Sequence, residues 1–389
     1  MKKFLAFLVK YERLILLLIV VASAITKLLW LSYPNEYKFD EVYHVPTVHK
    51  IILNDGSAYE WWHGELEDEL TSGAYIDWLH PPLAKYLSAL SVIAFGDHSF
   101  AWRLPSALAG VAVTWLVFCL AKNLWPKNPL IPLLSALLIT TEGLTFAQSQ
   151  IVMNDIVLLV WILAALIFWW KWQKKKTWRN LLLVTLFTGL AVGTKWSGLG
   201  LFLIYGWQVL LNFREQTWKK IWSLLVVLVG TGLVYLAVYI PLFATGHDWA
   251  HFVELHNQIW LYQTSLEAAH PYSSPAYLWP IGQKAVYLYL DATTGKKVWG
   301  TPSYPTFYLG LVGMILSVVL LLRNKDKKNP DRKSLVFLLI VFFSLWAPWL
   351  FSPRIMFLHH FLPAVPVVCI MAAFLLDWCT THYWLKDKK

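Results

Sequence analysis

Long apolar stretches separated by polar segments dominate the pattern of this chain. Ten of them are long enough to cross a hydrocarbon layer about 30 Å thick as helices. We expect these spans near residues 12–31, 102–121, 130–147, 152–171, 180–194, 196–212, 221–243, 304–322, 334–351 and 360–379. An even number of spans puts both termini on one side of the membrane. The pattern therefore predicts an all-α polytopic membrane protein.

Two long segments, about 32–101 and 244–303, separate spans on the side opposite the termini. Within the first, residues 83–95 are apolar at helical spacing but too few to cross a bilayer, so we expect a helix lying in the membrane interface. The second is rich in Trp, Tyr, His and Pro, which suits a membrane–water boundary. No repeat or separate soluble domain stands out. We therefore treat residues 1–389 as one transmembrane domain whose functional face is built from these two outer loops.

Composition supports this class, and the distribution of charge gives the orientation. Of the 389 residues, 58% are hydrophobic and only 14% are charged, whereas a soluble domain is nearer a quarter charged. The net charge is +10, but most Lys and Arg fall in segments on the side of the termini, as in cytoplasmic loops. A nucleic-acid-binding protein would instead gather them on a soluble face. We expect both termini in the cytoplasm and no nucleic acid as partner.

Two adjacent carboxylates, Asp40 and Glu41, follow the first predicted span at the outer side. Carboxylates at the rim of a membrane are costly and tend to be functional, although a solvated pair at a helix end is the plain alternative. The segment His80-Pro81-Pro82 lies on the same side. Because proline is tolerated in the first turn of a helix, His80 is expected just before a helix N-terminus, where backbone N–H groups favour an anion. An ordinary capping turn is the alternative there.

Three cations lie at the outer ends of predicted spans, against the general charge trend: Arg103, Lys195 and Arg354. Each therefore needs an anionic partner, and phosphate suits the planar fork of arginine. Contact with lipid headgroups is the alternative for each. His270, in the aromatic second loop, is a weaker candidate that is also compatible with interface packing. No pattern of paired ligands indicates a metal, and no cofactor is assigned, although a divalent metal is left open.

Taken together, these motifs resemble the protein O-mannosyltransferases, the dolichyl-phosphate-mannose–protein mannosyltransferase family of the GT-C membrane glycosyltransferases. The resemblance covers almost the whole chain and is closest to compact prokaryotic members. The matching segments are, in order, Asp40-Glu41, His80-Pro81-Pro82-Leu83-Ala84-Lys85, Arg103-Leu104-Pro105-Ser106-Ala107, Gly193-Thr194-Lys195-Trp196-Ser197-Gly198, His270-Pro271-Tyr272 with Trp279-Pro280, and Pro353-Arg354-Ile355-Met356-Phe357 followed by His359-His360-Phe361-Leu362-Pro363.

The resemblance implies a GT-C fold with about ten to eleven transmembrane helices in the cell membrane. It implies inverting transfer of mannose from a polyprenyl- or dolichyl-phosphate donor to Ser or Thr hydroxyls of secreted or membrane proteins, on the non-cytoplasmic face. Asp40 is then expected to be the general base, with Glu41 orienting it or holding the acceptor. Arg103 is the leading phosphate ligand, ahead of His80, Lys195 and Arg354. The remaining candidates for the donor or acceptor site are His270, Asp155 and His359.

The chain departs from the family pattern at one position, and two other functions stay open. The family usually has Ser-Arg before the fourth helix, where this chain has Ser149-Gln150. A related GT-C transferase could move the sugar to a lipid or glycan instead of a protein. A lipid-sugar transporter is the non-enzyme alternative, but transporters tend to place charges at the membrane midplane, whereas here they gather at one rim.

Overall fold

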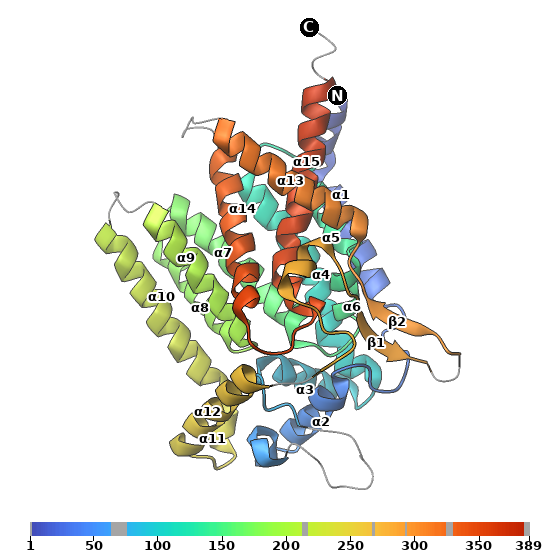
Figure 1. Cartoon of the computed structure of the whole chain (residues 1–389), viewed down its shortest axis with the longest axis vertical. Helices are drawn as coiled ribbons and strands as arrows, with labels where there is room; N and C mark the ends of the chain where they lie inside the picture. Colours follow the sequence, from blue (N-terminus) through green and yellow to red (C-terminus); the bar gives the residue numbers. More distant parts are fainter. Residues whose placement is uncertain are drawn as a thin grey trace.

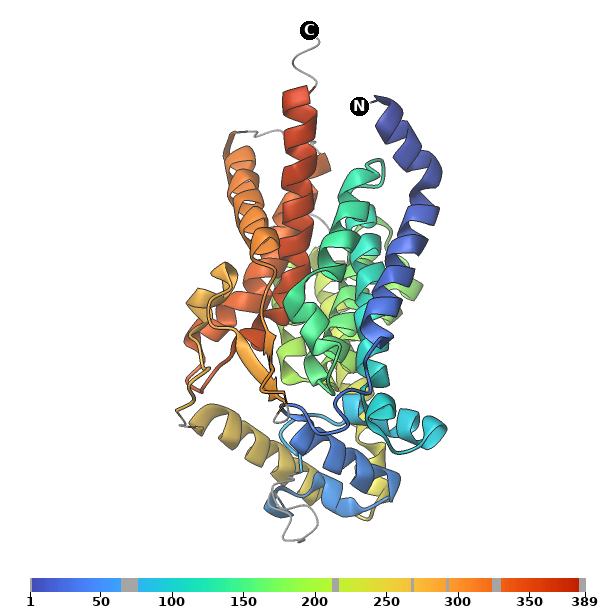
Figure 2. The same ribbon diagram turned by 90° about the vertical axis from the view of Figure 1, so that its right-hand side faces the viewer.

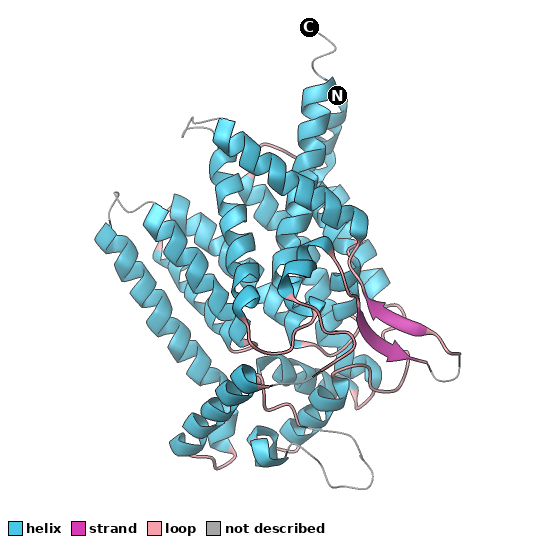
Figure 3. Cartoon of the chain, viewed as in Figure 1, coloured by secondary structure: helices cyan, strands magenta, loops and turns pink. Residues whose placement is uncertain are grey.

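Helices make up most of the structure, a computed structural model that describes residues 2–63, 76–211, 217–266, 269–291, 294–323 and 330–384 (Figure 3). Ten of them correspond to the ten predicted spans. They are α1 (Lys2–Leu28), α4 (Ser99–Leu124), α5 (Leu130–Thr140), α7 (Asn154–Lys174), α8 (Trp178–Val192), α9 (Gly200–Leu211), α10 (Thr217–Val238), α13 (Tyr304–Arg323), α14 (Pro330–Trp346) and α15 (Val365–Trp384).

Six of the predicted spans are confirmed as segments long and apolar enough to cross a membrane, counting only described residues. They are Ser99–Leu124, Asn154–Lys174, Ile221–Val238, Tyr304–Arg323, Asp331–Phe351 and Leu358–Thr381. The other four predicted stretches are helical but shorter or more charged. The stretch 130–147 is broken, because the Glu142 side chain accepts hydrogen bonds from two backbone N–H groups and so starts a separate helix, α6 (Gly143–Gln148).

Two helices form the centre of the bundle. In α7, 78% of the most apolar 18-residue stretch is buried. In the segment Leu358–Thr381, which includes most of α15, this share is 83%, whereas in α10 it is only 22%. Helix α13 packs closely on α15, because Gly310 and Gly313 lie against the backbone of Val368 and Met371, where a Cβ atom would collide. Small residues permit such close approach between membrane helices. The central helices thus give a rigid support, while α10 presents most of its surface outward.

The short helices gather at one end of the bundle, opposite the end where α1 begins and α15 ends (Figures 1 and 2). They are α2 (Glu41–Ile52), η1 (Gly56–Tyr59), η2 (Trp61–His63), α3 (Leu83–Phe95), α11 (Ile240–Ala244) and α12 (Trp249–Ser265). Helix α3 is confirmed over the predicted residues, with Leu90 and Ile93 exposed on one side. Its location in the membrane interface stays a prediction. The two long loops therefore fold into one layer at the end away from the termini.

The second long loop contains structure that the apolar pattern did not predict. Besides α12 it holds η5 (Ala276–Ile281) and an antiparallel hairpin of β1 (Val286–Leu290) and β2 (Lys297–Gly300), whereas α11 lies at the end of the predicted span 221–243. Tyr287 lies opposite Trp299 in this hairpin. Two further short helices, η6 (Ala347–Phe351) and η7 (Leu358–Ala364), link α14 to α15. These elements bring the ends of several spans against the layer of short helices.

Candidate active site

Two adjoining cavities lie between the helix bundle and the layer of short helices. The larger, of about 760 Å³, has a mixed lining of carboxylates, cations, histidines and aromatic rings. The smaller, of about 490 Å³, is lined mainly by apolar side chains of α9, α12, α14 and η6. The residues that line both are Leu79, His80, Lys195, Gln263, Arg354 and His360. A molecule with a polar head and an apolar tail could therefore occupy both cavities at once.

Asp40 lines the larger cavity from the N-cap position of α2. The preceding residue, Phe39, has φ 49°, in the left-handed region that a bulky side chain rarely adopts. This turn immediately precedes α2 and leaves Asp40 half-buried in the cavity wall. Burial raises the pKa of Asp40 to about 6, although the nearby His44 and Lys195 oppose the shift. A carboxylate with such a pKa is ionised at neutral pH and still basic enough to take a proton.

Glu41, the neighbour of Asp40, is fully buried and points away from the cavity toward α4. Its carboxylate forms a two-pronged ion pair with Arg103, with Nε–Oε1 and Nη2–Oε2 distances of 2.8 Å. It also accepts hydrogen bonds from the backbone N–H groups of Lys38 and Val152, at 2.8 and 2.9 Å. Glu41 therefore ties the start of α2 to α4 and to the segment before α7. These contacts are those of a residue that positions Asp40.

Arg103 does not reach the cavity where its phosphate contact was expected. Its side chain is 0% exposed, and all five of its N–H groups have partners. Two go to Glu41, and the other three go to the backbone carbonyls of Leu31, Pro34 and Glu36 at 2.6–3.1 Å. The structure thus corrects the sequence interpretation, because no donor of Arg103 is left for a phosphate. Its need for an anionic partner is met inside the protein.

A third carboxylate, Asp77, organises the cavity floor and was missed by the sequence analysis. Its oxygens lie 2.9 Å from His44 Nδ1, 3.1 Å from His80 Nδ1 and 3.0 Å from Lys85 Nζ. Burial alone would raise the pKa of Asp77, but Lys85, His80 and His44 outweigh it and hold that pKa well below the usual range. Asp77 therefore stays ionised, orients His80 through a hydrogen bond and places a negative charge beside His44. The signal available in the sequence was an acid three residues before His80.

Lys195 and Asp155 form an ion pair in the wall of the larger cavity. Lys195 Nζ lies 2.9 and 2.8 Å from the two carboxylate oxygens of Asp155, at the N-terminal end of α7. Lys195 precedes η4 (Trp196–Leu199) and lines both cavities, whereas Asp155 lines only the larger one. The pair fixes the ammonium group at the junction of the cavities.

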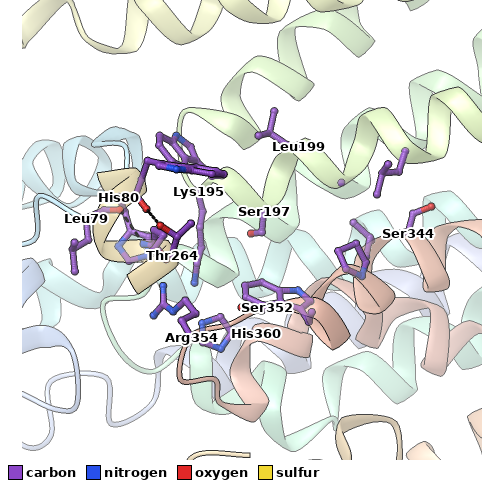
Figure 4. Close-up of a pocket in the computed structure, with 18 residues that line it drawn as sticks. Leu79, His80, Lys195, Ser197, Leu199, Thr264, Ser344, Ser352, Arg354 and His360 are labelled. Atoms are coloured by element: carbon purple, nitrogen blue, oxygen red, sulfur yellow. Dashed lines mark hydrogen bonds between the residues drawn. The ribbon is translucent and has the colours of Figure 1, made fainter. Parts of the chain in front are cut away.

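Arg354 also lies at this junction, in the loop between η6 and η7. Figure 4 shows its guanidinium group and the side chains of Lys195 and His360 converging at one end of the smaller cavity, away from Leu199 and Ser344. Its Nε donates to the carbonyl of Ile355 at 3.3 Å, and within the described residues no carboxylate forms an ion pair with it. Asp155 and Asp40 act on it only at longer range. Arg354 is therefore the cation here with most hydrogen-bonding capacity left for a ligand.

The remaining predicted residues, His270 and His359, both line the larger cavity. His270 is exposed at its edge, and its Nδ1 accepts a hydrogen bond from the N–H of Tyr272 at 3.2 Å. His359 is 5% exposed and stacks on His360, and its Nδ1 has no partner in the described part of the chain. Seven of the nine predicted side chains thus meet around one cavity, and only Glu41 and Arg103 lie behind its wall.

At the predicted point of departure from the family, Gln150 forms hydrogen bonds within the protein. Its Nε2 donates to the carbonyl of Lys27 at 2.7 Å, and its own carbonyl accepts from Lys38 Nζ at 2.8 Å. Within the described ranges, no three His, Cys, Asp or Glu side chains are arranged to share a metal ion. The chemistry that these residues can offer is one base, a cluster of cations for an anion, and an apolar recess beside them.

Two family models together cover nearly the whole chain. The model described as dolichyl-phosphate-mannose-protein mannosyltransferase matches residues 16–256, and the one described as the C-terminal four TMM region of protein-O-mannosyltransferase matches residues 248–389. The two models meet near the start of α12. Asp40, Asp155 and Lys195 lie in the first, while Arg354 and His359 lie in the second.

Curated relatives match part of their length. The polyprenol-phosphate-mannose–protein mannosyltransferase of Mycolicibacterium smegmatis is 28% identical over 217 residues, which is 49% of this chain and 39% of the relative. The undecaprenyl phosphate-α-4-amino-4-deoxy-L-arabinose arabinosyl transferase 1 of Pseudomonas fluorescens is 29% identical over 199 residues, 49% of this chain and 33% of that protein. The chain thus matches well under half the length of either.

A solved structure gives the fold. The Saccharomyces cerevisiae protein O-mannosyltransferase Pmt1-Pmt2 complex bound to the sugar donor superposes with a TM-score of 0.80 at 14% identity, over 97% of this chain and 86% of that one. The predicted GT-C fold is therefore confirmed. Because a family model covers more than half of the sequence, the chain belongs to the dolichyl-phosphate-mannose-protein mannosyltransferase family.

Proposed function

We propose that this protein transfers mannose from a polyprenyl- or dolichyl-phosphate carrier to Ser or Thr hydroxyls of proteins. Family membership and the similarity to the polyprenol-phosphate-mannose–protein mannosyltransferase of Mycolicibacterium smegmatis support this reaction. The observation that carries the proposal is the shared junction of the two cavities. There Arg354 and Lys195 lie between the apolar recess and the cavity wall that holds Asp40.

The two cavities match the two parts of such a donor. The smaller one offers apolar side chains such as Leu199, Leu203 and Trp349 to the first units of a polyprenyl tail. The phosphate would then lie at the junction, bound by Arg354, with Lys195 and His80 beside it. The sugar would project into the larger cavity toward Asp40. A volume of about 760 Å³ leaves room there for an acceptor residue as well.

The side chains fit an inverting displacement. The acceptor oxygen forms a bond to the anomeric carbon while the bond from that carbon to the phosphate oxygen breaks, and Asp40 takes the hydroxyl proton. A neutral hydroxyl is a poor nucleophile, so contact with a base of matched pKa is needed. The leaving group is a phosphate that is already a stable anion, so it needs positive charge nearby more than a proton. One carboxylate and a set of cations are therefore sufficient.

The location in the cell forms part of the proposal. The apolar helices make this a multi-pass membrane protein. We propose that it lies in the cell membrane with both termini in the cytoplasm and the cavities on the outer face. The excess of Lys and Arg in the loops at the terminal end supports this orientation.

Arg354→Ala is expected to lower kcat/KM for the lipid-linked donor by about 10²–10³-fold, because it removes a preorganised charge contact to the leaving phosphate. Arg354→Lys should recover part of the loss, since it restores charge without the planar fork. The measurement is transfer at varied donor and fixed acceptor concentration. Arg323→Ala, an exposed arginine at the far end of α13, serves as the matched control. Unchanged donor dependence in Arg354→Ala would remove this assignment.

Purified protein in lipid vesicles tests the reaction itself. With labelled polyprenyl-phosphate-mannose and a peptide containing Ser or Thr, label should appear on the peptide through a hydroxyl-linked hexose. The arabinosyl transferase relative favours one alternative, transfer of a carrier-linked sugar to a lipid. Label that enters a lipid fraction and never the peptide would replace the protein acceptor by that alternative. Label that crosses the vesicle membrane while still on its carrier would indicate a transporter.

A further inference from the structure

A continuous set of aromatic rings leads out of the larger cavity to the β-hairpin. Phe357 lines the cavity and contacts His270, with ring centroids 5.1 Å apart. His270 contacts Tyr272 at 5.6 Å, and Tyr272 stacks on Tyr287 at 5.4 Å with 21° between the planes. Trp299 meets both tyrosines edge-on, at 5.4 and 5.3 Å. We call these five rings the aromatic row.

The hairpin is anchored by its other face. Val286 and Leu288 are 1% and 3% exposed and belong to the main hydrophobic core. Gly300 on β2 lies beside Leu288 and Leu144, where a Cβ atom would make ordinary contacts. Because side chains alternate along a strand, Tyr287 is directed to the opposite face, where it pairs with Trp299 across the hairpin. The core thus holds the hairpin in place without the aromatic row.

The outer part of the row is accessible. Trp299 is 39% exposed, and Tyr272 and Tyr287 are half-buried. Because Tyr272 contacts both rings, His270 and Trp299 lie at most about 11 Å apart, the length of about three residues of extended chain. Lys284 donates to the carbonyl of Ser273, next to Tyr272, while Lys296 and Lys297 lie at the start of β2, and all three are exposed. The surface therefore combines partly exposed rings with positive charge nearby.

We infer that the aromatic row binds an extended segment of the acceptor polypeptide, some residues away from the hydroxyl that receives the sugar. The inference rests on the proposed function and adds a second acceptor subsite to it. The aromatic row is continuous with the proposed acceptor site, because it begins at a ring in the cavity wall and ends on the surface of the hairpin. Stacked tyrosines and an edge-on Trp bury apolar side chains at small entropic cost. The nearby lysines favour a neutral or acidic segment over a basic one.

Peptide length separates this role from a structural one. The probes are a short peptide, with one residue on each side of the hydroxyl residue, and the same peptide extended by five neutral residues on both sides. We expect wild-type kcat/KM to be clearly higher for the extended peptide. Trp299→Ala and Tyr272→Ala should each lower that value by about 3- to 10-fold, as expected for loss of one aromatic contact, and leave the short peptide unchanged.

Tyr277→Ala is the matched control, because this tyrosine lies in η5 of the same loop and is 66% exposed outside the row. It should alter transfer to neither peptide. Equal losses on both peptides, or no loss on the extended one, would overturn the inference and leave the rings as an anchor at the membrane surface. If wild-type protein uses the short peptide, the proposed function stands whatever the row does. If it uses neither peptide, both the proposed function and the inference fail.

Discussion

Asp40→Asn is expected to reduce mannose transfer by about 10²–10⁴-fold, the usual contribution of a general base in contact with its proton. The amide keeps the size of the side chain and its N-cap position on α2, but it cannot accept the hydroxyl proton. The measurement is the initial rate with saturating donor and a Ser/Thr peptide, at equal amounts of folded protein. Transfer close to the wild-type rate would exclude Asp40 as the base.

The pH profile gives an independent check on the same residue. Only the ionised carboxylate can act as base, and burial raises the pKa of Asp40 to about 6. Wild-type kcat/KM should therefore be level above this pH and fall about tenfold per unit below it. The residual activity of Asp40→Asn should not show this fall at low pH. Asp77 is a suitable contrast, because its neighbours hold its pKa well below the usual range and it stays ionised throughout.

Glu41→Gln is expected to lower the free energy of unfolding by about 3–5 kcal/mol, because it leaves the buried Arg103 guanidinium without a compensating charge. Gln keeps the shape of the side chain, so the loss reports the ion pair. The measurement is thermal unfolding of the purified protein in detergent, in which the midpoint should drop. Glu36→Gln is the control, since Glu36 is exposed and gives Arg103 only its backbone carbonyl.

Variants of the Glu41–Arg103 pair distinguish two roles of Arg103, namely positioning Asp40 and binding the donor phosphate. Arg103→Met should cost a similar amount, and combining it with Glu41→Leu should cost less than the sum, because no unpaired charge then remains. In the fraction of Arg103→Met protein that remains folded, kcat should fall strongly while KM for the donor changes little. The reason is that the start of α2, which carries Asp40, is held less firmly. A large rise in donor KM at normal stability would restore Arg103 as a phosphate ligand.

Much of the fold could be predicted from apolar length, because in a bilayer a run of about 20 apolar residues has few alternatives to a helix. The short helix Leu83–Phe95 was also predicted over its full length. The break within 130–147 was missed, since it depends on the single side chain of Glu142. The hairpin was missed because Val286–Leu290 is short, and its stability comes from core contacts that only the folded chain supplies.

The sequence indicated most of the residues of the candidate site, but not which of their side chains pair with one another. Charges near the ends of the predicted spans were informative, because a membrane protein seldom holds them there without use. Which cation meets which anion depends on contacts across long sequence separations, such as Glu41 with Arg103 and Asp155 with Lys195. Arg103 therefore had the right chemistry for a phosphate and the wrong partner. Asp77 was overlooked because its role depends on three side chains that converge only in space.

The junction residues come from both ends of the chain: His80 and Lys195 precede α9, whereas Arg354 and His360 follow α14. A nascent polypeptide whose last helices have not yet been inserted thus has Asp40, His80 and Lys195 but still lacks Arg354 and His360. If the proposed transfer needs Arg354, it can begin only after the last helices are in place. The same division means that a chimera joined near α12 would combine Asp40, His80 and Lys195 of one parent with Arg354 and His360 of the other.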